Sequence, residues 1–69
     1  MTYQLQGFQT LNTERGNDAE RSADTLKEAR KEAKYMLSDE YRRASEVSDK
    51  LAIVQIWKGE ELIDEIFGT

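Results

Sequence analysis

Residues 51–67 read LAIVQIWKGEELIDEIF, and this stretch decides the fold. Its first half is rich in β-branched and aromatic side chains, which are typical of a strand. Lys58 and Gly59 interrupt the apolar run, and a second run follows over 60–67. Two strand-like runs around a short turn that contains glycine predict a β-hairpin. The apolar residues of 60–67 are also spaced to suit one face of a helix, so a short helix there is the alternative.

Upstream of the hairpin, residues 25–45 predict one long amphipathic helix. Thr25 and Glu28 stand three residues apart, as in a capping box. Apolar residues then recur at steps of three and four and form one stripe, made of Leu26, Ala29, Ala33, Met36, Leu37, Tyr41 and Ala44. Val47 is a further candidate for this stripe. A break near Ser38 and Asp39, giving two shorter helices, is the alternative. The helix is expected to end within 45–50.

The N-terminal residues 2–11 predict another strand. Tyr3 and Leu5 alternate with glutamines, which gives a period of two. Gly7 then interrupts the alternation, and an isolated glycine in a strand indicates a bulge or a close backbone approach. The polar residues 12–23 predict a loop, and a weak second strand near 19–22 is the alternative.

These elements predict a single α+β domain over residues 1–69 in the order β-α-β-β. One long amphipathic helix packs on one face of a three-stranded sheet, and strand 51–57 runs parallel to the first strand after a right-handed crossover. Ile53 and Val54 point to opposite faces, and one helix covers only one face. We therefore expect an uncovered apolar sheet face that binds a second copy or another protein. Coverage by the polar loop 12–23 is the alternative.

The composition excludes several kinds of chemical site. The chain has no cysteine and no histidine, which removes disulfides, the usual zinc ligands and histidine-based nucleophilic catalysis. Its four glycines lie far apart and form no phosphate-binding loop. Adjacent acids such as Asp64 and Glu65 point to opposite faces of a strand, so they do not converge on one ion. We expect no enzymatic activity, no cofactor and no metal.

The charge balance is acidic, with a net charge of −4 from 14 acidic and 10 basic residues. This argues against a nucleic-acid binder that relies on phosphate contacts. The predicted helix nevertheless has a local basic face, and weak nucleic-acid binding is an alternative through Lys27, Arg30, Lys31, Lys34, Arg42 and Arg43. No apolar run reaches about 18 residues, and the N-terminus does not resemble a signal peptide. We expect a cytoplasmic protein.

The candidate binding residues lie on and beside the hairpin. Trp57 adjoins the turn, and aromatic residues often anchor interfaces. The hairpin acids would guard a sheet edge against aggregation or steer a basic partner. Tyr35 lies on the shoulder of the helical stripe and is a further candidate. The predicted protein-binding site is Trp57, Glu60, Glu61, Asp64, Glu65 and Tyr35.

The chain resembles the small accessory proteins of bacteriophages and mobile elements, including the anti-CRISPR proteins. The resemblance rests on the length of 69 residues, the acidity, the lack of cysteine and histidine, and the β-α-β-β order ending in WKGEEL at 57–62. It implies an inhibitor that binds a CRISPR effector or another nucleic-acid-handling complex in the host bacterial cytoplasm. The basic helix face departs from a wholly acidic DNA mimic and favours a local acidic patch. A structural or regulatory homodimer is the alternative.

Overall fold

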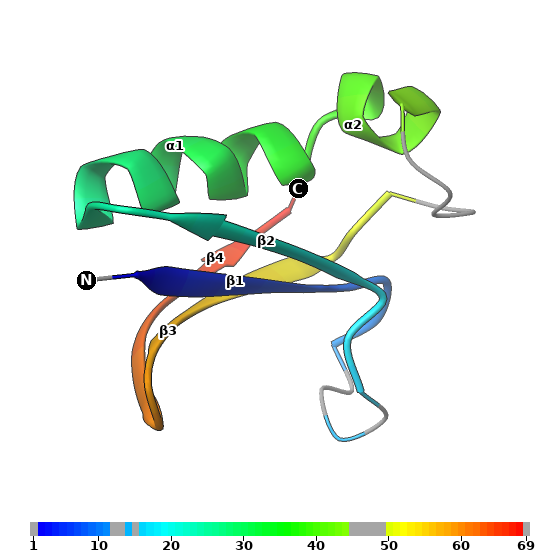
Figure 1. The fold of residues 1–69 in the computed structure, drawn as a ribbon. Helices are drawn as coiled ribbons and strands as arrows, with labels where there is room; N and C mark the ends of the chain where they lie inside the picture. Colours follow the sequence, from blue (N-terminus) through cyan, green and yellow to red (C-terminus); the bar gives the residue numbers. More distant parts are fainter. Residues whose placement is uncertain (1, 12–13, 15, 45–49, 69) are drawn as a thin grey trace.

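The computed structural model describes residues 2–11, 14, 16–44 and 50–68. Within these residues the chain forms β1 (Tyr3–Phe8), β2 (Ala19–Ala23), α1 (Leu26–Met36), α2 (Asp39–Ala44), β3 (Ile53–Lys58) and β4 (Glu61–Phe67). The strands form one antiparallel sheet in the order β2-β1-β3-β4, and α1 lies across one face of it (Figure 1). The predicted α+β class is confirmed, whereas the predicted three strands and single helix are wrong.

The additional strand is β2, which corresponds to the weak strand considered near 19–22. It pairs antiparallel with β1 from Tyr3 opposite Ala23 to Gly7 opposite Ala19. Because β2 reverses the chain before the helix, β3 runs antiparallel to β1, and the predicted parallel pairing is wrong. Only Ala23 of β2 is buried, so this strand carries almost none of the apolar alternation by which strands are recognised.

The helical segment begins as predicted but breaks in the middle. The Thr25 side chain accepts a hydrogen bond from the Glu28 N–H at 3.1 Å, which caps α1. Ser38 donates its hydroxyl to the Tyr35 carbonyl and accepts from the Tyr41 N–H. This side chain offers the backbone an alternative to continuous helix, so α1 ends and α2 begins there. The predicted single helix is wrong and the alternative break is confirmed; Val47 and most of the expected terminus at 45–50 lie outside the described residues.

The C-terminal hairpin is confirmed, and the alternative helix over 60–67 is wrong. Gly59 has a φ of 64°, a left-handed conformation that glycine adopts without steric cost. Pairing shifts by one residue within β4, because Ile56 is opposite Asp64 but Trp57 is opposite Leu62. Ile63 is therefore the extra residue of a β-bulge.

The core lies between α1 and the middle of the sheet. Ala29 and Ala33 are fully buried on α1 and belong to one cluster with Leu5, Val54 and Ile56 of the central strands. Full burial of each of these three larger side chains contributes about 1.5–3 kcal/mol. A side chain on Gly7 would meet the side chains of Leu51 and Met36. The glycine therefore makes room for core side chains; its pairing with β2 and β3 is regular, so the predicted bulge is absent there.

The sheet face opposite α1, called the open face below, is better covered than expected. Ile53 is only 3% exposed and Val54 is 0% exposed, so a single chain encloses both side chains. The prediction of an uncovered apolar face at Ile53 is wrong. Its cross-strand neighbours explain this result, because Phe8 and Phe67 flank Ile53 in the register, and such neighbours lie about 5 Å apart.

Leucine-to-alanine substitutions at two positions test this core. Leu5→Ala should lower the free energy of unfolding by about 2–5 kcal/mol, because it leaves a cavity beneath α1. Leu11 is the matched control, since it is 68% exposed. There the same substitution should change stability by less than about 0.5 kcal/mol. Urea unfolding followed by circular dichroism measures both, and equal losses would contradict this core.

Candidate protein-binding surface

The tip of the β3–β4 hairpin exposes an apolar pair on the open face. Trp57 of β3 is half-buried, and its cross-strand partner Leu62 of β4 is 40% exposed. The bulge creates this pair, because a regular register would place Ile63 opposite Trp57. Ile63 packs against the core instead. The bulge therefore presents Leu62 to solvent beside the indole.

A chain of side-chain hydrogen bonds fixes the indole of Trp57. Its Nε1–H donates to Gln55 Oε1 at 3.1 Å, and Gln55 Nε2 donates to Glu65 Oε2 at 3.0 Å. Gln55 is nearly buried, and each of its two polar atoms has a partner. An aromatic ring held in place before binding loses little rotational entropy when a partner covers it. Trp57 and Glu65 are therefore preorganised on the open face.

The turn of the hairpin carries unpaired negative charge. Glu60 and Glu61 are exposed, and neither carboxylate pairs with a Lys or Arg of the described residues. Lys58 is the hairpin's basic residue, and its ammonium lies over the ring of Tyr3, 5.8 Å from the centroid. Lys58 is the cross-strand partner of Glu61, but no ion pair of the described residues joins the two side chains.

Asp64 has an intramolecular role at the edge of the sheet. One carboxylate oxygen lies 3.4 Å from Arg30 Nε, and the other accepts the Glu65 N–H at 2.9 Å. The Gly68 N–H donates to the Ala52 carbonyl, so it points inward to the neighbouring chain segment. Along an antiparallel strand the N–H groups alternate in direction, and the Glu65 N–H, three residues earlier, therefore points away from β3. Asp64 therefore occupies a backbone donor on the outer edge of the sheet, as edge protection requires.

Tyr35 lies away from the hairpin tip, in the helical layer on the other side of the sheet (Figure 1). Its ring meets that of Tyr41 edge to face at 5.3 Å, and the Arg21 guanidinium lies 5.4 Å from its centroid. Arg21 also pairs with Glu32 at 2.8 Å. These contacts join α1, α2 and β2, so the structure does not bring Tyr35 together with Trp57.

The predicted basic helix face is partly neutralised. Arg30 pairs with Asp64, and Arg42 pairs with Asp39 at 3.5 Å. The other four of the six basic residues considered for nucleic-acid binding have no ion pair among the described residues: Lys27, Lys31, Lys34 and Arg43. In the same part of the chain, no group of three or more acidic residues is placed to hold a metal ion.

Sequence reasoning missed two residues of this surface, Leu62 and Gln55. Leu62 looked like one member of an apolar run, and only the bulge places it opposite Trp57. Gln55 was an interruption in an apolar strand, and a polar residue in such a position is the signal that could have identified it. Comparison with protein-family models, curated proteins and solved structures finds no match. Neither described helix is long and apolar enough to cross a membrane.

Replacing Asp64 tests its role at the sheet edge. Asp64→Ala should make the protein self-associate in a concentration-dependent manner, because the freed Glu65 N–H and the apolar residues of β4 then present an open edge. Glu61→Ala removes the same charge from an exposed acid of β4 and should leave the protein unchanged. Sedimentation velocity over a range of concentrations measures both variants. Unaltered sedimentation of Asp64→Ala would contradict this role.

Proposed function

We propose that this chain is a non-enzymatic protein-binding module whose contact surface is the tip of the β3–β4 hairpin. One observation carries the proposal: a fixed Trp57 and an exposed Leu62 share one face of the hairpin with Glu65. The exposed acids Glu60 and Glu61, which have no ion pair among the described residues, precede Leu62 at the hairpin tip. An apolar anchor beside polar groups resembles the anatomy of protein interfaces, in which a few aromatic residues supply most of the binding energy. The partner is therefore expected to offer an apolar pocket bordered by Lys or Arg.

The acidic border favours a partner that normally binds nucleic acid. Lys and Arg that contact phosphate would also attract Glu60, Glu61 and Glu65, and an occupied site would exclude the nucleic acid. This chemistry supports the function that the resemblance to phage and mobile-element proteins implies. We therefore propose an inhibitor of a nucleic-acid-handling complex such as a CRISPR effector, acting through a local patch and not through an acidic surface on all sides.

A homodimer through the open face is the weaker candidate. The argument for it depended on an uncovered Ile53, and that side chain is enclosed within one chain. The exposed apolar side chains of the open face lie at its two ends, Leu62 at the hairpin tip and Phe67 opposite Ile53. Between them lies the polar pair Gln55 and Glu65, which separates the apolar surface into two small areas.

Capture from a nuclease-treated bacterial lysate tests the proposed inhibitor. The immobilised protein should retain a nucleic-acid-binding protein, and added duplex DNA or high salt should release it, because both compete for the same cations. Affinity for the purified partner should fall about fivefold for Glu60→Lys and for Glu61→Lys, since each reversal replaces an attraction by a repulsion. Emission from Trp57, the single tryptophan, should shift on binding.

Glu40→Lys provides the matched control, because Glu40 is an exposed acid of α2 remote from the hairpin. It changes the net charge equally and should leave partner affinity unaltered. Leu62→Ala should weaken binding without affecting stability, which tests the apolar half of the surface separately. A partner bound equally well by the three hairpin variants, or insensitive to competing DNA, would refute the proposal.

A further inference from the structure

The two edges of the sheet differ in their availability for pairing. On β4, Asp64 occupies the outward Glu65 N–H, as described above. Next to β2, the Asp18 N–H donates to the Gly7 carbonyl, and Gly7 is the cross-strand partner of Ala19. The backbone groups of Ala19 therefore point toward β1. The alternation of antiparallel pairing then turns the backbone N–H and C=O groups of Glu20 and Ser22 outward. No hydrogen bond within the described residues occupies these outward groups.

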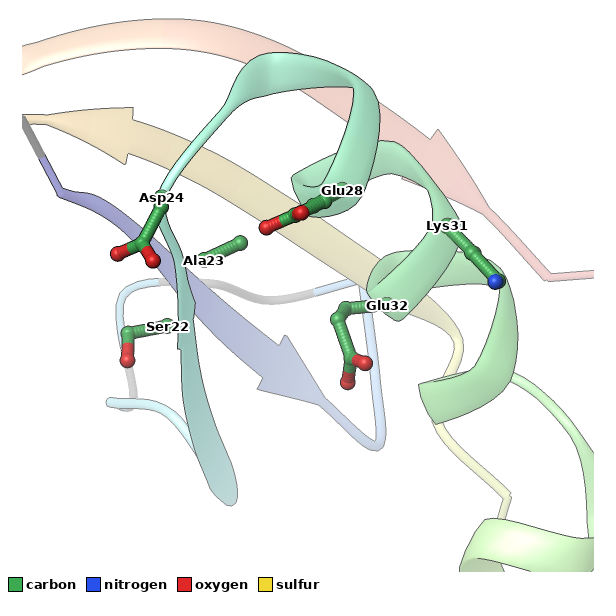
Figure 2. A pocket seen from close by; sticks show the side chains of 6 residues that line it. All are labelled: Ser22, Ala23, Asp24, Glu28, Lys31 and Glu32. Atoms are coloured by element: carbon green, nitrogen blue, oxygen red, sulfur yellow. The ribbon is translucent and has the colours of Figure 1, made fainter.

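A groove runs between this free edge and the first turns of α1. It has a volume of about 460 Å³ and is lined by Ser22, Ala23, Asp24, Glu28, Lys31 and Glu32. Figure 2 shows that the Glu28 carboxylate extends from α1 toward β2, whereas the Lys31 ammonium points away from the strand. The groove is therefore bounded by strand backbone on one side and by acidic helix side chains on the other.

The acids of this groove retain capacity for a cation. Asp24 and Glu28 have no ion pair among the described residues. Glu32 Oε2 is buried and lies 2.8 Å from Arg21 Nε, so it already has one cationic partner. An ionised carboxylate has lone pairs for several donors, so an additional charged N–H could extend this ion pair.

We propose that β2 and α1 form a docking groove for an extended segment of a partner protein with basic side chains at alternate positions. Backbone pairing with Glu20 and Ser22 would extend the sheet by one strand. Side chains of the added strand alternate between its two faces, so every second one points to the helical side, toward Glu28 and Glu32. The occupant therefore needs lysine or arginine at those positions, and the charge of the groove selects it.

A second copy of this chain fits the groove less well. Its own β2 edge reads AERSA and contains one basic residue, Arg21. That guanidinium already contacts Glu32 and the rings of Tyr35 and Tyr41. Pairing of two β2 edges would bring no free cation to the groove. The inference is independent of the proposed hairpin function, because β2 and β4 are opposite edges of the sheet.

A synthetic peptide tests the groove directly. The probe is a seven-residue peptide with lysine at the second, fourth and sixth positions and threonine, a strand-favouring residue, elsewhere. Titration into the isotopically labelled full chain at low salt should shift the backbone amide resonances of Glu20, Ser22 and Glu28. The amides of Glu20 and Ser22 should also exchange more slowly with solvent, because they then donate to the added strand.

Matched probes and variants separate strand pairing from charge. Glu28→Gln and Glu32→Gln should each weaken peptide binding about threefold, the effect of one exposed ion pair. Glu40→Gln, at an exposed acid of α2 that does not line the groove, should have no effect. A peptide methylated on alternate backbone nitrogens retains its charge but cannot donate to β2, and it should bind markedly less tightly than the parent. Replacing its lysines by glutamine should abolish binding.

Four results would overturn the inference. Absence of amide shifts at millimolar peptide concentration would show that the groove accepts no such strand. Shifts confined to the β3–β4 hairpin would place the binding elsewhere. Equal affinity for the methylated peptide would indicate attraction by charge alone. Concentration-dependent protection of the Glu20 and Ser22 amides without peptide would assign the edge to a second copy of the chain.

Discussion

The structure depends on the close contact between α1 and the two central strands. Ala29 and Ala33 are the smallest side chains that continue an apolar stripe, and both are fully buried. Their size lets the helix approach the sheet, and Gly7 keeps β1 free of a side chain where Leu51 and Met36 pass. Leu5 and Ile56 then fill the space beneath the helix. A domain of this length buries only about 60% of its unfolded surface, so one such contact accounts for much of its stability.

Because the helix covers only one face, the other face and the two edges of the sheet remain as three distinct surfaces. The open face retains Trp57 and Leu62 at one end, where the bulge at Ile63 and the hydrogen bonds of Gln55 position them. The outer edge of β4 is occupied by Asp64, while the outer edge of β2 borders an acidic groove. An inhibitor that engages its target through the hairpin would leave the opposite edge available for another contact.

The fold class, the hairpin and the cap at Thr25 could be predicted because they depend on local signals. β2 could be predicted only as a weak alternative, because a strand at the edge of a sheet that faces solvent needs few apolar residues. The pairing of Trp57 with Leu62 depends on the bulge, and the enclosure of Ile53 depends on Phe8 and Phe67 from other strands. These features come from the register between strands, which a pattern within one segment does not reveal.

The strand order also has a consequence for the kinetics of folding. β3 and β4 are joined by a tight turn and can associate rapidly, whereas β1 must find β3 near the other end of the chain. Closing that long loop costs conformational entropy before the contacts beneath α1 can compensate for it. The sequence has no proline and no cysteine, so neither prolyl isomerisation nor disulfide exchange can delay the process. We therefore expect the meeting of β1 with β3 to set the refolding rate.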